Sequence, residues 1–190
     1  MIRGATVNDV PTFAKIINDC AEYGLMLHRS MEYLYEHVRD FRLTVDDEAR
    51  VTGVCGLRVV WADLAEVYAL AIESDYRGQG LGKQLVEACV DEARGLGIPR
   101  LMTLTYEQTF FGKLGFELCD RQQLPLKVWR ECVGCLKNQD CDETAMVRVL
   151  DDVPKLAVPE PIRPAENAYF VPVTLKVASS GRRRKMDQAP

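Results

Sequence analysis

A glycine-rich stretch in the middle of the chain, DYRGQGLGKQLVEACVDEA (residues 75–93), runs directly into an amphipathic segment. Leu81, Leu85, Cys89 and Ala93 recur every fourth residue, which predicts a helix that begins at about Leu81. The glycines before it lack a Cβ atom, so the loop can adopt positive φ angles and turn successive backbone N–H groups toward an anion. The N-terminal end of a helix also carries unpaired N–H groups and the positive end of the helix dipole. Loop and helix together therefore predict a binding site for a phosphate or pyrophosphate.

The spacing of the glycines distinguishes between kinds of phosphate-binding loop. A Walker A loop requires a glycine where this chain has Arg77 and a Ser or Thr where it has Gln84, so that motif is absent. A dinucleotide-binding fingerprint requires glycines at positions 78, 80 and 83, but residue 83 is lysine. A glycine-rich turn that does no more than start a helix stays open as an alternative to any phosphate site.

The stretch does contain Arg77-x-x-Gly80-x-Gly82, and it resembles the R/Q-x-x-G-x-G/A signature of the acetyl-CoA-dependent N-acetyltransferases of the GNAT superfamily. The resemblance implies that the loop binds acetyl-CoA as co-substrate. The implied cofactor-binding residues of the loop are Arg77, Gly78, Gln79, Gly80, Leu81, Gly82 and Lys83.

The predicted elements follow the order of that superfamily. A near-continuous apolar run, LAEVYALAI (residues 64–72), is typical of a central strand buried on both faces, and it leads into the glycine loop. Before it we expect a short strand at residues 2–6, a helix entered through Asn8 or Asp9, a helix starting at Ser30, and a hairpin over residues 41–61. After it we expect a strand, a short helix ending at Gly115 and a further strand. The resemblance implies a GNAT fold of the α/β (α+β) class, with a mixed, mostly antiparallel sheet flanked by helices.

The composition changes near residue 150. Six of the nine prolines fall in residues 151–190, and the chain ends with the basic run GRRRK followed by five residues. We therefore expect one GNAT domain over residues 1–150 and a largely flexible extension over residues 151–190, with one strand conceivable at AYFVPVTLKV. No aromatic residues interleave with the basic run, which favours a solvated tail over a nucleic-acid arm.

Charge and cysteine content limit the partners and the cellular compartment that we expect for the protein. A net charge of −4 and a pI near 5.3 argue against a nucleic-acid partner bound by general electrostatics. The sequence shows neither a signal peptide nor an apolar run long enough for a membrane span, so we expect no membrane partner. Seven cysteines without a secretion signal indicate a reducing compartment, and we expect the cytoplasm. The oligomeric state is open, a homodimer included.

Two further segments resemble the acetyltransferase domain of the N-acetylglutamate synthases. They are IPRLMTLTYEQTFFGKLGFELCDRQQLP (residues 98–125) and MLHRSMEYLYEHVRDF (residues 26–41). The chain most resembles the short synthases, which lack the amino-acid-kinase domain of the long ones. The resemblance implies transfer of acetyl from acetyl-CoA to the α-amine of L-glutamate, the first step toward arginine.

The central strand and its neighbours supply the implied catalytic groups. In the GNAT pattern the backbone of Leu70, Ala71 and Ile72 pairs with the pantetheine arm of CoA and faces the reacting carbonyl. Glu66 lies four residues before Leu70, so strand periodicity predicts that both share a face. A partly buried carboxylate with a raised pKa suits a general base for the substrate ammonium, and an ion pair with Arg58 is the alternative role for Glu66.

The leaving thiolate lacks the acid that many GNAT enzymes provide. Those enzymes place a tyrosine four residues before the glycine of a GF pair, but that position here is Phe111, which we expect at the cofactor. Because a CoA thiol resembles free cysteine, with a pKa of about 8.5, it can leave as thiolate with little help. Tyr106 is a substitute candidate for the acid, although a tyrosine at a strand end often serves packing only.

Glutamate carries two carboxylates, and guanidinium forks suit carboxylates best. Arg29 matches the arginine of the synthase R-S segment, and Ser30 follows it at a predicted helix start. Lys127 and Arg130 are second choices for the same task. The long synthases also place a cation just before the central strand, but this chain has Asp63 there.

The cysteines near residue 130 allow a metal site. Cys132, Cys135 and Cys141, with Cys119 thirteen residues before the first, provide enough thiols for a structural zinc ion. Only the first pair has ligand-like spacing and buried thiols often serve as small hydrophobes, so we expect no metal.

Two rival functions stay open at this point. One is a GNAT enzyme with another amine acceptor, such as an aminoglycoside, a polyamine or a protein N-terminus. The other is a catalytically silent module that senses acyl-CoA.

Overall fold

The computed structural model describes residues 1–121, 124 and 142–155. The chain divides into two units, Met1–Val158 and Pro159–Pro190, and all described residues belong to the first unit. The strand suggested at AYFVPVTLKV and the basic run GRRRK lie outside the described residues.

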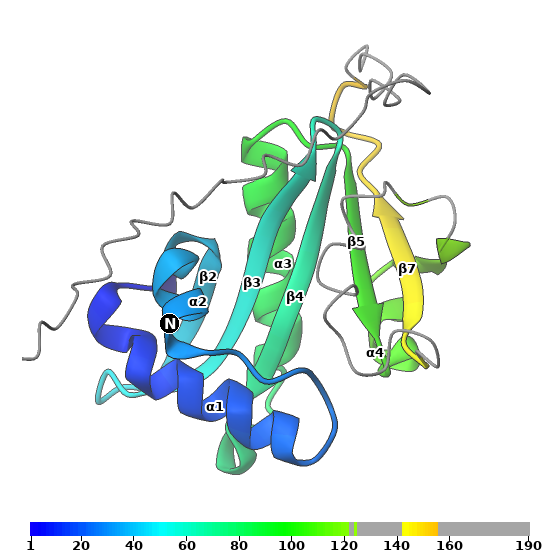
Figure 1. The fold of residues 1–190 in the computed structure, drawn as a ribbon. Coiled ribbons are helices and arrows are strands. Elements are labelled where there is room, and N and C mark those ends of the chain that lie inside the picture. Colours follow the sequence, from blue (N-terminus) through cyan, green and yellow to red (C-terminus); the bar gives the residue numbers. More distant parts are fainter. Residues whose placement is uncertain (122–123, 125–141, 156–190) are drawn as a thin grey trace, which may run out of the picture. The chain divides into compact units, whose positions relative to one another are not determined.

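The described residues form a seven-stranded sheet in the order β1-β2-β3-β4-β5-β7-β6 (Figure 1). Neighbouring strands are antiparallel except β4 and β5, which are parallel. The mixed, mostly antiparallel sheet expected from the sequence is thus confirmed, although β7 was not among the expected strands. The strands are β1 (Ile2–Gly4), β2 (Phe41–Val45), β3 (Val51–Trp61), β4 (Leu64–Ile72), β5 (Arg100–Thr105), β6 (Glu117–Leu118) and β7 (Thr144–Val149).

Helices cover both faces of this sheet. Figure 1 shows α1 and α2 in front of the strands and α3, which connects β4 to β5, behind them. The described α-helices are α1 (Val10–Glu22), α2 (Met31–Glu36), α3 (Leu81–Gly95) and α4 (Gln108–Gly112), and the short 3-10 turns are η1 (Val7–Asp9), η2 (Val38–Asp40) and η3 (Ser74–Tyr76).

Apolar spacing explains the two long helices. In α3, Leu85, Cys89 and Ala93 are fully buried against the sheet, and the helix begins at Leu81 as its periodicity predicts. α1 likewise buries Phe13 and Ile17 on one face, and these side chains meet β2, β3 and β4 in a second core cluster. The sheet is therefore held between two apolar layers.

The central strand β4 contains a β-bulge. Gly56 of β3 pairs with Tyr68, whereas Val54, two residues earlier on β3, pairs with Ala71, three residues later on β4. The extra residue lies next to Ala69, whose φ of 50° is in the left-handed region. One additional residue reverses the alternation of side chains between the two faces of the strand.

The bulge overturns one prediction about the site. Val67 before it and Leu70 after it both pack against the cluster around α3, while Tyr68 and Ala71 pack on the α1 side. Glu66 alternates with Val67 and so faces the α1 side. The expectation that Glu66 and Leu70 share a face is wrong, because it assumed an unbroken period of two along the strand.

β4 and β5 pair with each other only near their first residues. Ala65 pairs with Leu101 and Glu66 with Met102, whereas β5 pairs with β7 along its whole length. Beyond these two pairs β4 and β5 diverge (Figure 1). The diverging halves of both strands line a cavity, which holds the candidate site.

Candidate active site

A cavity of about 570 Å³ lies between the diverging halves of β4 and β5. The loop between α1 and α2 and the glycine loop before α3 also contribute to its wall. Of the residues predicted from the sequence, it is lined by Arg29, Glu66, Leu70, Ala71, Ile72, Arg77, Gly78, Gly80, Leu81, Gly82, Tyr106 and Phe111. The fold thus brings the two halves of the predicted site, cofactor loop and acceptor segment, to one cavity.

Two glycines of the loop need the freedom of glycine. Gly78 has φ of 78°, and Gly80, the residue before the first turn of α3, has φ of 78° and ψ of 4°. A Cβ atom at either position would meet no atom within 4 Å, so it is the backbone conformation, and not crowding, that favours glycine. Gly82 has no positive φ and lies inside the first turn of α3, where an added Cβ would lie 3.5 Å from the ring of Phe110. Positive φ therefore accounts for Gly78 and Gly80 only.

The cations of the loop divide into one that faces the cavity and one that does not. Arg77 lines the cavity; its Nε donates to the backbone oxygen of Ile72 at 3.1 Å, and its Nη2 contacts Cys20 Sγ at 3.5 Å. Lys83 and Gln79 are exposed and are not part of the cavity wall. Of the two charged side chains, only Arg77 is held where an anion in the cavity would meet it.

Arg29 is fixed at the cavity by both its backbone and its side chain. Its N–H donates to Asn18 Oδ1 at 2.9 Å, and its carbonyl accepts from Asn18 Nδ2 at 3.0 Å. The guanidinium carbon lies 4.8 Å from the ring centroid of Tyr33 and 6.0 Å from that of Tyr68. Ser30 caps α2 as predicted, since its Oγ accepts from the Tyr33 N–H at 3.2 Å, but it is not part of the cavity wall.

A second arginine, Arg58, also lines the cavity. It lies on β3 directly opposite Glu66 of β4, and its Nε donates to Glu66 Oε2 at 2.9 Å. Its guanidinium carbon is 5.1 Å from the ring centroid of Tyr68. The sequence suggested Arg58 only as a partner of Glu66. The pairing of β3 with β4 is what places Arg58 at the cavity that Arg29 also lines.

Glu66 is the buried carboxylate of the site. Its side chain is 8% exposed, it lines the cavity, and it forms the ion pair with Arg58. The alternative role considered for this residue, an ion pair with Arg58, is thus present in the structure. An ion pair at the cavity wall does not by itself exclude proton transfer, because a ligand carboxylate can compete for the same guanidinium.

Beside the two arginines, the buried Tyr68 and the half-buried Asp40 form a polar contact. The Tyr68 hydroxyl donates to Asp40 Oδ2 at 3.0 Å. Burial, together with the charge of Asp40, raises the pKa of Tyr68 far above its usual range, and burial raises the pKa of Asp40 as well. Tyr68 therefore stays a neutral phenol that presents its ring to both guanidinium groups.

The two aromatic residues that the sequence predicts near the thioester, Phe111 and Tyr106, differ in their surroundings. Phe111 is buried and lies edge-on to Phe110 and Phe116, with ring centroids 5.1 and 5.3 Å away. Tyr106 lines the cavity, but its hydroxyl donates to Asp142 Oδ1 at 2.8 Å. A phenol engaged in this way must give up that bond before it can protonate a leaving sulfur.

Several predicted residues lie outside the described part of the chain. These are Lys127, Arg130, Cys132, Cys135 and Cys141. Within residues 1–121, 124 and 142–155, no three His, Cys, Asp or Glu side chains gather as metal ligands would. Nor does any helix in these ranges have the length and apolar character needed to cross a bilayer.

Comparison with known proteins agrees with this geometry. Residues 11–116 match the acetyltransferase (GNAT) family. An uncharacterised N-acetyltransferase of Chlorobaculum tepidum is 34% identical over 149 residues, which are 78% of this chain and 96% of that protein. An amino-acid acetyltransferase of Neisseria meningitidis is 34% identical over 126 residues, 65% of this chain and 29% of that enzyme.

The fold is also similar to that of solved structures. N-acetylglutamate synthase from Neisseria gonorrhoeae, complexed with coenzyme A and N-acetyl-glutamate, superimposes with a TM-score of 0.72 at 30% identity. The match covers 79% of this chain and 35% of that one. The chain thus spans about a third of the length of these Neisseria enzymes.

Proposed function

The chain belongs to the acetyltransferase (GNAT) family and is an acetyl-CoA-dependent N-acetyltransferase, and we propose that its acceptor is the α-amine of L-glutamate. The observation that carries the proposal is the presence of two guanidinium groups, those of Arg29 and Arg58, in the cavity that the glycine loop also lines. The similarity to an amino-acid acetyltransferase and to an N-acetylglutamate synthase supports it. In this proposal the product enters arginine biosynthesis, and the reaction takes place in the cytoplasm.

The cofactor half of the site uses the glycine loop and the open edge of β4. We assign the CoA pyrophosphate to the N–H groups around Gly78 and Gly80, the N-terminus of α3 and the guanidinium of Arg77. Because β4 pairs with β5 only at Ala65 and Glu66, the later residues of β4 have backbone groups on that side for the pantetheine arm. Acetyl-CoA would then lie in the gap between the two strands.

The acceptor half uses the two arginines. A guanidinium fork binds a carboxylate through two parallel hydrogen bonds, so two forks match a dicarboxylic amino acid better than a monocarboxylic one. Arg29 comes from the loop before α2 and Arg58 from β3, so they approach the cavity from different elements.

The chemical step requires a deprotonated amine. The nitrogen attacks the thioester carbonyl carbon, the C–N bond forms, the C–S bond breaks, and the electron pair leaves on sulfur. The substrate ammonium loses two protons in all. We assign the first, lost before the attack, to Glu66, directly or through water, once the acceptor carboxylate shares Arg58 with it. The second, lost from nitrogen as the amide forms, passes to water or to the CoA thiolate. Backbone N–H groups of the segment from Leu70 to Ile72 that face β5 would stabilise the oxyanion. CoA thiolate, with a pKa of about 8.5, leaves without a dedicated acid.

The test is a thiol-release assay with acetyl-CoA against a panel of amines. We expect L-glutamate to give the highest kcat/KM and aspartate, one methylene shorter, to be a poor acceptor because its second carboxylate stops short of its fork. Equal turnover of glutamate and aspartate, or preference for an amine without carboxylates, would reject glutamate as the acceptor.

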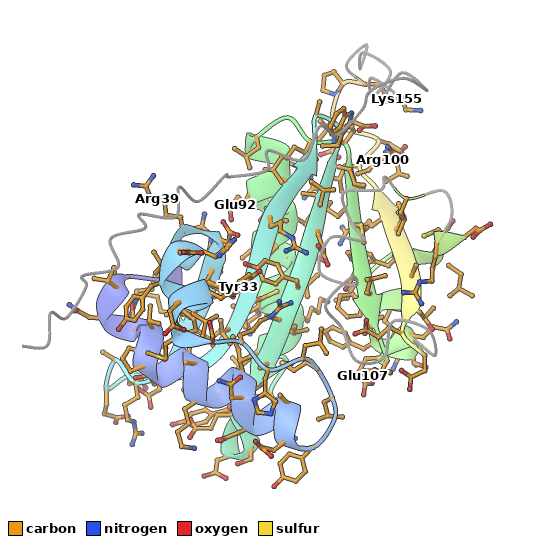
Figure 2. The ribbon with its side chains drawn as sticks, viewed as in Figure 1. Tyr33, Arg39, Glu92, Arg100, Glu107 and Lys155 are labelled. Carbon is orange, nitrogen blue, oxygen red and sulfur yellow. The ribbon has the colours of Figure 1, made fainter. Side chains whose placement is uncertain are left out.

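A matched pair of variants tests the role of Arg29. Arg29→Lys keeps the charge but loses the fork, so kcat/KM for glutamate should fall about ten- to a hundredfold, mostly through KM, while KM for acetyl-CoA changes little. Arg39→Lys is the control, because Arg39 is exposed and points away from the protein in Figure 2. Equal effects of the two substitutions would remove Arg29 from the acceptor site.

One observation favours a second class of acceptor. Glu107 and Glu143 also line the cavity, and Figure 2 shows Glu107 beside α4. Carboxylates there attract an acceptor with an additional cationic group, such as a basic amino acid or a polyamine. The same panel of amines distinguishes the two classes of acceptor. If the acceptor is basic, it should give a higher kcat/KM than glutamate, and this difference should disappear in Glu143→Gln.

A further inference from the structure

Tyr33, in the first turn of α2, is held rigidly by its own helix. Ser30 Oγ accepts its N–H at 3.2 Å, and its carbonyl accepts the His37 N–H at 3.1 Å. Its ring stacks on the imidazole of His37 with centroids 4.1 Å apart and planes 18° from parallel. One face of the Tyr33 ring is therefore covered by His37, the residue that follows α2.

Both cavity arginines contact this tyrosine. The Arg29 guanidinium carbon lies 4.8 Å from the ring centroid of Tyr33, and Arg58 Nη1 donates to the Tyr33 hydroxyl at 3.4 Å. Figure 2 shows Tyr33 between α2 and the central strands, which is where a side chain of α2 can reach an arginine of β3. Tyr33 itself is not part of the cavity wall, so it cannot act on an acceptor except through the arginines.

We propose that Tyr33 is a positioning residue for acceptor recognition, which holds the guanidinium groups of Arg29 and Arg58 at a fixed separation. The inference rests on the proposed function, because the separation matters only if both forks bind one acceptor. An arginine side chain has many rotamers, and ordering it on binding costs affinity. A ring under one guanidinium and a hydroxyl on the other restrict both before the acceptor arrives, which lowers that cost.

The kinetic test separates the ring from the hydroxyl. Tyr33→Phe keeps the ring and removes the hydroxyl, and with it the bond from Arg58, so it should raise KM for glutamate about two- to tenfold. Tyr33→Leu also removes the stack with Arg29 and should raise it further, to about thirtyfold. KM for acetyl-CoA should stay within about twofold in both variants, because neither arginine belongs to the glycine loop.

The control is Tyr35→Leu, two residues along the same helix. Tyr35 is 44% exposed, so this variant makes the same change in helix propensity on the solvent side. It should keep the wild-type kinetics. A Tyr33→Leu variant whose KM for glutamate is unchanged, or whose KM values for glutamate and acetyl-CoA rise together, would overturn the proposal.

A second measurement decides the inference even if glutamate is not the acceptor. In NMR spectra of the whole chain, the Nε–H signal of Arg29 and the Nη–H signals of Arg58 should be shifted and ordered by Tyr33, whereas Arg58 Nε–H is held by Glu66. In Tyr33→Leu the Arg29 Nε–H and Arg58 Nη–H signals should move toward the values of solvent-exposed arginines, and in Tyr35→Leu neither should move. If the wild-type protein does not acetylate glutamate, the proposed function is rejected. If the arginine signals are unchanged in Tyr33→Leu, the positioning role of Tyr33 is rejected. Tyr33→Phe keeps the ring, and its near-wild-type Arg29 signal serves as the check that the fold is retained.

Discussion

Gly80→Glu should abolish useful acetyl-CoA binding while leaving the fold intact. Gly80 immediately precedes α3 with φ of 78°, it lines the cavity, and a side chain there would project into open space. The new carboxylate would occupy the volume that we assign to the pyrophosphate. Gly97, just beyond the other end of α3, has φ of 72° and the same open surroundings, and it is not part of the cavity wall. Gly97→Glu is therefore a matched control.

The magnitudes follow from conformation and charge. A residue with a Cβ atom in the left-handed region costs about 1–2 kcal/mol, and this cost is common to both variants. A carboxylate about 4 Å from a phosphate charge costs between about 1 and 4 kcal/mol, depending on the effective dielectric, and only Gly80→Glu has this cost. Together with the lost volume, we expect affinity for acetyl-CoA to fall at least about tenfold in Gly80→Glu and within about twofold of wild type in Gly97→Glu.

Stability should follow the opposite order. A carboxylate at the N-terminal end of a helix is favoured by about 0.3–1 kcal/mol and at the C-terminal end disfavoured by a similar amount. Urea unfolding should therefore show Gly80→Glu as the more stable of the two variants, and isothermal titration calorimetry should show it as the one with the weaker affinity for acetyl-CoA. Equal affinities, or an equal loss in both variants, would refute the assignment of the pyrophosphate to this loop.

Three further substitutions test the fold around the site. Arg3 hydrogen-bonds Asp9 and holds the pKa of that carboxyl well below its usual range, so the stabilisation from this pair is fully present above about pH 5 and is lost as the pH falls toward the folded-state pKa of Asp9. Asp9→Asn should therefore lower the free energy of unfolding by about 1–2 kcal/mol at pH 7. Urea midpoints should show the difference between this variant and the wild type shrinking below about pH 4. Tyr68→Phe leaves the half-buried Asp40 without the hydroxyl that donates to it, so it should cost about 1–3 kcal/mol in the same assay; an unchanged midpoint would contradict this. Ala69→Gly removes the left-handed strain at the bulge and should change stability by no more than about 1 kcal/mol, in the stabilising direction, whereas a marked loss would mean that the Ala69 side chain contributes packing.

The cofactor half of the site could be predicted because its signals are local. The helix from Leu81 follows from apolar residues four apart, and Gly78 and Gly80 follow from the conformation that an anion-binding turn requires. Each of these depends on residues within one or two turns of one another. The N-cap at Ser30 was predictable for the same reason.

The acceptor half was less predictable because it depends on contacts between distant segments. Arg58 gains its place at the cavity from its pairing opposite Glu66, and Tyr33 gains its role from Arg29 and Arg58 reaching it from two other elements. Strand β7 was also missed, because its place between β5 and β6 depends on pairing with two strands that lie far from it in the sequence. Residue type alone does not reveal such pairings.

The bulge at Ala69 was not predictable, and it determines which residues of β4 face each side of the sheet. Alanine rarely adopts φ of 50°, so nothing in LAEVYALAI indicates that the alternation breaks there. Before the break, Glu66 and Tyr68 face the side of α1 and α2, where the two arginines lie; after it, Leu70 packs on the side of α3. Without the extra residue, Leu70 would point at the arginines and would crowd the acceptor with an apolar side chain. The bulge lies in the part of β4 that no longer pairs with β5. The backbone that we assign to the thioester is therefore also a segment without hydrogen bonds to β5. A left-handed alanine, which costs about 1–2 kcal/mol, therefore lies where the residues that we assign to the acceptor and to the cofactor change from one face of the strand to the other.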